Sequence, residues 1–250
     1  MKMTLKMSLA VATTLLLCSN AFADPASYFA ANGFTQFQNN QVIDGYTQLE
    51  DYVGSEGRVY PGWGGQAFDA EYLFYKQTGT TLYLGLQTGF DLSTGNQQAS
   101  YYSGDLALKI NSSSYNYAID FGFAAQKDYY NTDLPSTAGL YAVTGWNTGI
   151  AFTGSSPFAM ATGTLTANLI ENTLGTSSDS YYRIVAFNLT SLNLNLNTPL
   201  DIIAHWTMSC GNDAIDGSFR TAPVPEPATM LLFGTGLMGL AGIARRRRNS

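Results

Sequence analysis

Histidine and cysteine are scarce in this chain of 250 residues. His205 is the single histidine, which argues against Ser–His–Asp triads and against metal sites built from several histidines. The two cysteines are Cys18 and Cys210, and Cys18 lies in a segment that we expect to be removed. The remaining single cysteine permits no internal disulfide. On an extended strand, His205 and Cys210 would lie about 16 Å apart on opposite faces, which argues against a Cys–His catalytic pair.

Basic residues are also few. Between Asp24 and Pro225 the chain has 17 acidic against 6 basic residues, a net charge of −11. A surface of this sign repels phosphate groups, so we expect no nucleic-acid partner. No Gly-rich stretch ends in Lys-Ser or Lys-Thr, so a phosphate-binding loop is excluded as well. Cations and neutral sugars remain compatible with this charge.

The N-terminus has the three parts of a secretory signal peptide. Lys2 and Lys6 are followed by the apolar run Met7 to Leu17, and Ala21-Phe22-Ala23 supplies small residues around a cleavage site. We therefore predict export through the Sec machinery and a signal peptide over 1–23, which makes Asp24 the first mature residue.

The C-terminus has three parts of a different kind. Val224-Pro225-Glu226-Pro227 precedes an apolar run from Ala228 to Ala244, and Arg245-Arg246-Arg247-Arg248 follows it. A membrane-spanning helix needs about 20 apolar residues, so a run of this length is near the lower limit. Four arginines resist translocation, which keeps the end of the chain cytoplasmic and places the body outside.

This order of motif, apolar helix and arginines resembles the PEP-CTERM sorting signal of Gram-negative bacteria. The resemblance implies processing by an exosortase at the inner membrane, followed by delivery to the cell surface or an extracellular matrix. It covers 223–250, about a tenth of the chain, and implies no activity for the rest. It predicts that the hydrophobic helix over 228–244 is a transient inner-membrane anchor.

Each terminus has an alternative interpretation. At the N-terminus, Cys18 would be the acylated residue of a lipoprotein, although Leu17 stands where a small residue is expected. At the C-terminus, the apolar run would be a permanent anchor with the same topology, and the tail would then stay uncut.

The body over 24–222 alternates apolar and polar residues with the period of a β-strand. Phe68, Ala70, Tyr72 and Phe74 share one face of a first strand, and a turn at Thr78-Gly79 leads to its partner. Further strands are expected at 106–110, 115–123, 139–143, 163–170, 181–188 and 200–208, with a helical turn within 188–197. This pattern predicts an all-β domain, an antiparallel β-sandwich or jelly roll, with a signal peptide before it and a hydrophobic helix after it.

The inward positions of these strands predict one buried core. Its expected members are Leu82, Leu84, Leu86, Leu106, Leu108, Tyr117, Ile119, Phe121, Ile184, Ala186, Ile202, Ala204 and Trp206.

A second resemblance lies inside the body. The stretch from Trp63 to Glu71, a hairpin, and Gly104-Asp105-Leu106-Ala107-Leu108 together are loosely similar to family-9 carbohydrate-binding modules and DOMON-type β-sandwich domains. The stretch from His205 to Asp213 resembles the region that often precedes PEP-CTERM tails. No binding residue follows from this resemblance.

Two long irregular stretches, 87–103 and 125–135, are the expected binding loops, because loops on a rigid sandwich commonly carry ligand contacts. They contain the tyrosine pairs Tyr101-Tyr102 and Tyr129-Tyr130, whose flat rings would stack on sugars. The alternative is that these rings cover the edges of the core.

Two oxygen-rich segments are candidates for a calcium site. One segment holds Asp91, Asn96 and Asp105, and another loop holds Asn212, Asp213 and Asp216; neither matches the twelve-residue calcium loop, and the alternative is plain turn residues. We otherwise expect no cofactor.

Asp69 and Glu71 lie on one strand face at i and i+2, a spacing that permits the separation a glycosidase pair requires. The expectation is that they belong to a hydrated outer face. The sequence thus favours a non-catalytic module that associates with exopolysaccharide, with a secreted hydrolase of matrix polysaccharide as the alternative.

Overall fold

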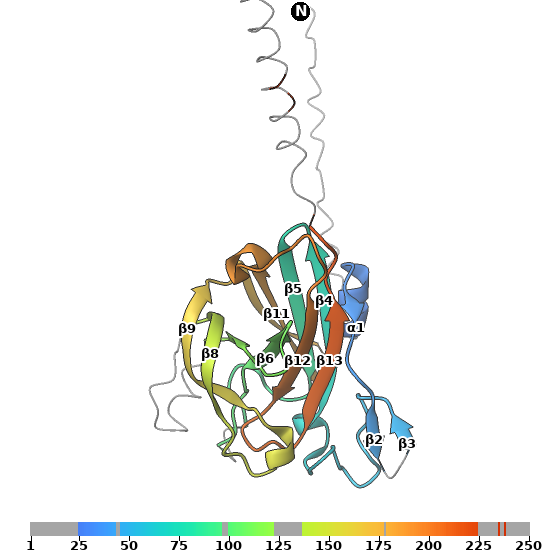
Figure 1. The fold of residues 1–250 in the computed structure, drawn as a ribbon. Helices are drawn as coiled ribbons and strands as arrows, with labels where there is room; N and C mark the ends of the chain where they lie inside the picture. Colours follow the sequence, from blue (N-terminus) through green and yellow to red (C-terminus); the bar gives the residue numbers. More distant parts are fainter. Residues whose placement is uncertain are drawn as a thin grey trace, which may run out of the picture.

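The computed structural model describes residues 25–43, 46–96, 100–122, 137–177, 179–224, 235 and 238. These residues form two antiparallel β-sheets that pack face to face, with a short helix and three 3-10 turns at their margins (Figure 1). The predicted all-β antiparallel sandwich is therefore confirmed.

The first sheet has five strands in the order β1–β4–β5–β11–β10. Their bounds are β1 Thr35–Gln36, β4 Ala70–Thr78, β5 Thr81–Thr88, β10 Glu171–Ser177 and β11 Ser180–Asn188. Hairpins join β4 to β5 and β10 to β11. The β4–β5 hairpin turns at the predicted Thr78-Gly79, where Gly79 has a φ of 57°, a conformation that favours glycine.

The second sheet has six strands in the order β13–β12–β6–β7–β8–β9. Their bounds are β6 Leu106–Ile110, β7 Tyr117–Asp120, β8 Gly139–Asn147, β9 Ala159–Ala167, β12 Asp201–Thr207 and β13 Ala214–Arg220. The chain runs through β6 to β9 as a meander and returns to this sheet in the β12–β13 hairpin. A separate two-stranded ribbon, β2 Gln41–Ile43 and β3 Tyr46–Gln48, lies beside the sandwich (Figure 1).

Three 3-10 turns connect the strands: η1 Gly65–Phe68, η2 Thr153–Ser155 and η3 Leu189–Leu192. The η3 turn lies within the helical turn predicted for 188–197. The Asn188 side chain caps it by accepting a hydrogen bond from the backbone N–H of Thr190.

The core lies between the two sheets, as the alternation predicted. Twelve of the thirteen expected core residues are buried, and the exception, Tyr117, is half-buried against the same cluster. Trp206 is fully enclosed, and its indole N–H donates to the Gly104 carbonyl at 3.2 Å. The cluster is thus built of apolar side chains, and the polar edge of its largest member, Trp206, is paired.

The prediction that Ala70, Tyr72 and Phe74 share one face of β4 is wrong after Ala70, the first residue of the strand. The pairing of β4 with β5 shifts register between Ala70 and Tyr72, which indicates a β-bulge at Glu71. After the bulge, Leu73 belongs to the core between the sheets, whereas Phe74 belongs to a separate outer cluster. One extra residue therefore moved the following side chains to the opposite face.

The outer cluster also contains Ile184, which the sequence assigned to the main core. Helix α1 (Pro25–Ala31) covers it, and Phe29 of this helix stacks on Phe74 with ring centroids 4.1 Å apart. Gly85 of β5 makes room for this contact, since a Cβ at that position would overlap the Phe29 ring. The first sheet is therefore apolar on both faces under α1, which simple alternation does not anticipate.

Several predictions fall outside the described residues. These are the signal peptide with Ala21, Ala23 and Asp24, the motif residues Pro225, Glu226 and Pro227, and the tail Arg245 to Arg248. Of the apolar run 228–244, Thr235 and Met238 are described, and both are helical. In the described part of the chain, no helix combines the length and the apolar composition that membrane crossing requires.

Candidate functional site

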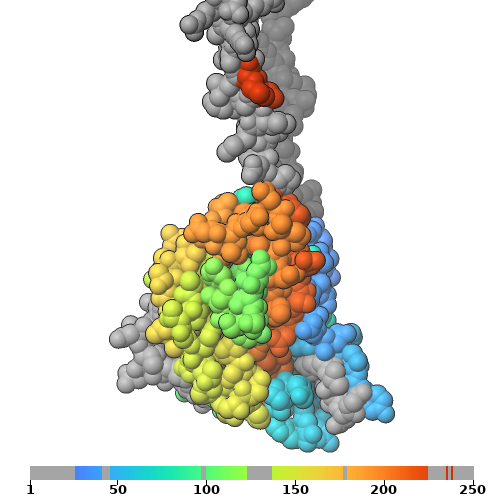
Figure 2. All heavy atoms as spheres, in the orientation of Figure 1, coloured from blue at the N-terminus to red at the C-terminus, as the bar shows by residue number. Residues whose placement is uncertain are grey.

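One segment near the end of the sandwich exposes an unusual amount of aromatic surface. Tyr52, Tyr60 and Trp63 are 41%, 53% and 54% exposed, and Tyr46 and Leu49 lie open on the same segment. In the space-filling view this segment, coloured cyan, forms the lower margin of the molecule (Figure 2). Large apolar side chains that gather in one exposed place often mark a binding surface.

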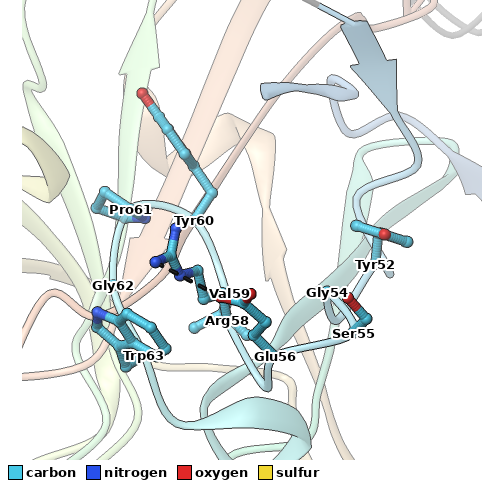
Figure 3. A pocket seen from close by; sticks show the side chains of 10 residues that line it. All are labelled: Tyr52, Gly54, Ser55, Glu56, Arg58, Val59, Tyr60, Pro61, Gly62 and Trp63. Carbon is cyan, nitrogen blue, oxygen red and sulfur yellow. Dashed lines mark ion pairs between the residues drawn. The ribbon is translucent and has the colours of Figure 1, made fainter. Parts of the chain in front are cut away.

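The rings of Tyr52, Tyr60 and Trp63 line a pocket of about 560 Å³. Figure 3 shows Trp63 and Tyr52 on opposite sides of it, with Glu56 and Arg58 between them. The complete lining is Tyr52, Gly54, Ser55, Glu56, Arg58, Val59, Tyr60, Pro61, Gly62 and Trp63. Aromatic walls with a few polar groups are typical of sites for small molecules or for single units of a polymer.

Backbone hydrogen bonds give the pocket loop its shape. Gly57 has a φ of 71° and its carbonyl accepts from the N–H of Gly65 at 2.8 Å, which closes the loop on itself. Arg58 and Trp63 also form an isolated β-bridge. The two walls of the pocket are therefore held together locally, although the loop contains no long strand.

The turn between β12 and β13 fixes this loop to the sandwich. Asn212 accepts from the Trp63 N–H through its side-chain Oδ1 at 2.6 Å and from the Gly62 N–H through its carbonyl at 2.8 Å. A Cβ at Gly62 would overlap Asn212 Oδ1, so glycine is required by this close approach. Asn212, predicted as a member of an oxygen-rich loop, holds the aromatic pocket in place, and its part in calcium binding stays a prediction.

The pocket contains an exposed ion pair between Glu56 and Arg58. Arg58 Nη2 lies 3.6 Å from Glu56 Oε2, and the Arg58 guanidinium lies 4.2 Å from the centre of the Trp63 ring. Exposed ion pairs contribute little to stability, but a guanidinium over an indole orients both groups. The pocket thus offers an acceptor, a donor and a positioned ring at one place.

A cluster of carboxyl groups lies behind this segment. Asp51, Asp69 and Glu71 each place an oxygen within 4.8 Å of the others. Asp69 and Glu71 are 0% and 1% exposed, so the predicted hydrated outer face is wrong. This end of β4 is buried because of the bulge at Glu71 and because η1, with the segment before η1, covers it.

The carboxyl groups of the cluster differ in their partners. Glu71 Oε1 accepts from Gln66 Nε2 and Ser180 Oγ, both at 2.7 Å, and its Oε2 accepts from Gln87 Nε2. Asp51 Oδ2 accepts from the Tyr72 hydroxyl at 2.7 Å. No N–H or hydroxyl group among the described residues donates to either oxygen of Asp69, whose side-chain hydrogen-bonding neighbour is another carboxyl group, Asp213.

Burial shifts the titration of these groups strongly. Burial, reinforced by the neighbouring Asp213 and Glu71 carboxyls, raises the pKa of Asp69 to about 8. Burial raises the pKa of Glu71 to about 7, although the hydrogen bonds from Ser180 and Gln87 oppose the shift. Asp213 is fully buried, and burial raises its pKa well above the usual value. Asp69 and Glu71 therefore keep their protons to a higher pH than ordinary carboxyl groups do.

The predicted metal ligands do not come together. Asp91 accepts hydrogen bonds from Ser93 and Thr94 in its own turn. Asp105 is buried and accepts from the Met160 N–H at 2.8 Å. Of the four predicted aspartates, Asp213 alone interacts with the acidic cluster, through Asp69.

The predicted loop of Asn212, Asp213 and Asp216 is wrong in its last member. Asp216 lies in β13, where its Oδ1 is 3.0 Å from His205 Nδ1. The other ring nitrogen of His205 lies 3.0 Å from the Ser155 carbonyl. Both ring nitrogens of His205 thus have partners, Asp216 and the Ser155 carbonyl.

Of the predicted tyrosines, Tyr101 and Tyr102 are described, and neither lines this pocket. Tyr101 is half-buried against the main core and packs edge-on against Phe68, and Tyr102 is half-buried as well. Tyr129 and Tyr130 are outside the described residues. The loop 87–103 does border a separate hollow of about 410 Å³ that includes Asp91, Asn96 and Tyr181. Its role in binding stays a prediction.

Sequence reasoning missed Tyr52 and Tyr60 and noted Trp63 only within a resemblance. A signal was present, since Tyr60-Pro61-Gly62-Trp63-Gly64-Gly65 places two aromatic residues in a stretch too rich in Gly and Pro for a strand. Aromatic residues in such a stretch have no regular sheet face on which to be buried.

Comparison with known proteins identifies one part of the chain. Residues 223–248 match the PEP-CTERM protein-sorting motif, as the sequence predicted. The motif makes this an exported protein with a C-terminal membrane-anchoring signal that an exosortase recognises. No curated protein and no solved structure matches the chain, so the likeness of its body to family-9 carbohydrate-binding and DOMON-type domains stays a prediction.

Proposed function

We propose that this PEP-CTERM domain-containing protein is a non-catalytic module that binds exopolysaccharide at the cell surface or in the extracellular matrix. The observation that carries the proposal is the pocket walled by Tyr52, Tyr60 and Trp63, each more than two-fifths exposed. The sorting signal supports export of the body, and exopolysaccharide would be available to an exported protein at the cell surface or in the matrix. After Sec-dependent export, the tail would hold the body at the inner membrane until it is cut.

The chemistry of the pocket suits a neutral or cationic sugar. Aromatic rings provide flat apolar area for the C–H faces of a sugar ring, and neighbouring polar groups bind its hydroxyls. Glu56 and Arg58 supply an acceptor and donors beside the Trp63 ring. The net charge of −11 between Asp24 and Pro225 disfavours polymers that carry phosphate.

The alternative, a hydrolase of matrix polysaccharide, depends on Asp69 and Glu71. Their raised pKa values resemble those of a general acid. Both side chains are nevertheless enclosed, and Glu71 already accepts from Gln66, Gln87 and Ser180. A glycosidic oxygen would have to reach them, so the enclosure favours binding over catalysis.

The test is a binding assay with the full chain in mild detergent and exopolysaccharide of the producing bacterium immobilised on beads. The Tyr60→Ala, Trp63→Ala double variant should bind about tenfold more weakly or worse, because it removes two of the three aromatic walls of the pocket and a loss of about 1.4 kcal/mol is already tenfold. Tyr46→Ala is the matched control, since Tyr46 is exposed on the same segment but does not line the pocket.

The same assay separates the other candidates. Equal binding by the double variant and the wild type would reject the pocket. Loss of binding in a Tyr129→Ala, Tyr130→Ala variant, or in a Tyr101→Ala, Tyr102→Ala variant, would assign the contact to the predicted loops instead. Release of reducing sugar ends that disappears in Glu71→Gln would replace the binding module with the hydrolase.

A further inference from the structure

We infer that Asp51, Asp69 and Glu71 form a binding site for a divalent cation of the calcium class. The site differs from both oxygen-rich segments that the sequence suggested. Its ligand atoms come from a loop, the end of η1 and strand β4, and they approach within 4.8 Å of one another. The inference concerns cation binding itself and does not depend on the proposed polysaccharide function.

The buried oxygens at this place carry the inference. Both carboxyl oxygens of Asp69 are buried, and the hydrogen-bonding neighbour of this side chain is another acid, Asp213, so the contact between the two carboxyl groups needs a proton or a cation. The amide oxygen of Gln87 is also buried, and no described residue donates to it, while its Nε2 donates to Glu71 Oε2. Buried polar atoms in folded proteins nearly always have partners, and one cation can serve several acceptors at once.

The backbone holds Asp69 in this position. Its carbonyl accepts from the N–H of Gly89 at 2.8 Å, and its own N–H donates to the Gln66 carbonyl at 3.2 Å. The hydrogen bonds to Glu71 come from η1, β5 and β11, so three separate elements orient that carboxylate. The ligand oxygens are thus placed before any cation arrives, as a metal site requires.

The type of ligand selects the type of cation. The cluster offers carboxylate and amide oxygens, which suit hard cations such as Ca²⁺. Within the described part of the chain, it includes neither histidine nor cysteine, the usual ligands of zinc. Asp51 is exposed, so water can complete a shell of about six to eight oxygens from that side. Mg²⁺ is disfavoured because it demands stricter geometry and keeps most of its own water.

A cation at this site would also affect the neighbouring pocket loop. Asp51 directly precedes Tyr52, and Gln66, which holds Glu71, lies shortly after Trp63. A cation bound by Asp51 would join the start of the pocket loop to β4. An increase of polysaccharide affinity by calcium would follow, and this single consequence rests on the proposed function.

The experiment uses the full chain in mild detergent after treatment with chelator. Calorimetric titration with CaCl₂ should show saturable binding with a stoichiometry near one, and MgCl₂ should bind at least about tenfold more weakly. Tb³⁺, which replaces Ca²⁺, should give tyrosine-sensitised luminescence, because the Tyr72 hydroxyl lies 2.7 Å from Asp51 Oδ2. Calcium in excess should quench this luminescence.

Two substitutions distinguish ligands from structural residues. Asp69→Asn and Asp51→Asn should each weaken calcium binding at least about tenfold. Asp69→Asn should leave the melting temperature in chelator unchanged or higher, since it removes a buried acid, but should abolish the rise that calcium produces. Asp201→Asn, which removes an exposed carboxylate paired with Arg220, is the matched control and should bind like the wild type.

Two results would overturn the inference. One is a wild-type chain that takes up no calcium at millimolar concentration. The other is unchanged affinity in both Asp69→Asn and Asp51→Asn, which would place any bound calcium elsewhere. Because these readouts use the metal alone, they remain informative if the chain binds no polysaccharide.

Discussion

Replacing Asn212 by Ala should loosen the aromatic pocket without disturbing the sandwich. The change removes Oδ1, the acceptor at 2.6 Å from the Trp63 N–H, whereas the bond from Gly62 to the Asn212 carbonyl can remain. An unsatisfied buried donor costs about 1–3 kcal/mol. Because the bond is only partly buried and water can replace it in part, we expect a loss of about 1 kcal/mol in the free energy of unfolding.

The effect on binding should exceed the effect on stability. Trp63 would lose one of the bonds that set its orientation, so the pocket would spend less time in its binding geometry. Urea denaturation measures the free energy of unfolding, and the polysaccharide assay measures binding. Acrylamide quenching of tryptophan fluorescence should also rise, because the loosened Trp63 is the exposed tryptophan, whereas Trp146 is half-buried and Trp206 is fully buried.

Asn195→Ala is the matched control for this variant. The Asn195 side chain also accepts a backbone N–H, that of Asn197 at 3.0 Å, but the bond is local and exposed. Its loss should change the free energy of unfolding by no more than about 0.5 kcal/mol. If Asn212→Ala matched Asn195→Ala in stability, quenching and binding, the turn between β12 and β13 would not support the pocket.

Four further predictions follow from the fold, the buried acids and the tail. Leu84→Ala or Leu108→Ala should lower the free energy of unfolding in urea by about 2–5 kcal/mol, because each is fully buried between the sheets; a loss below 1 kcal/mol would contradict that placement. Burial raises the pKa of the Cys210 thiol to about 11, so it should react with a thiol reagent in denaturant and hardly at all in the native state; rapid native labelling would contradict its burial. In chelator, stability should fall as pH rises from about 4 to 8, because Asp69 and Glu71 have folded-state pKa values of about 8 and 7, above those of the unfolded chain; a stability that increases over this range in thermal melts would refute the shifts. Exosortase processing should remove the tail near Pro225-Glu226, and an intact mass that retains Arg245 to Arg248 would reveal a permanent anchor instead.

Strands whose two faces differ in polarity were predictable from the sequence. Leu82, Leu84 and Leu86 recur at every second position, between Tyr83, Gly85 and Gln87, and became the centre of the core. Strand β10 (Glu171–Ser177) was missed because it is a polar edge strand without such alternation. The seven-residue helix α1 was also missed, since a helix this short depends on packing, here through Phe29, and hardly on its own periodicity.

The acidic cluster could not be predicted from spacing alone. Charged residues are rarely buried, so Asp69 and Glu71 appeared to belong to a solvated face. Their burial depends on the bulge between Ala70 and Tyr72 and on partners far away in sequence, Gln87 and Ser180. The sorting signal was recognisable because its parts are contiguous, whereas this site exists only after the strands have paired.

Two neighbouring residues connect the pocket with the acidic cluster. On the turn between β12 and β13, Asn212 holds the Trp63 N–H, and Asp213 accepts from the Ala70 N–H at 2.8 Å beside Asp69. A shift of this turn would therefore alter both places together. If a cation fixes the cluster, it should also fix the pocket, and by linkage a bound sugar should tighten the cation in the same proportion. Measuring calcium affinity with and without polysaccharide tests this reciprocity: equal affinities would show that the two places act independently despite their common support.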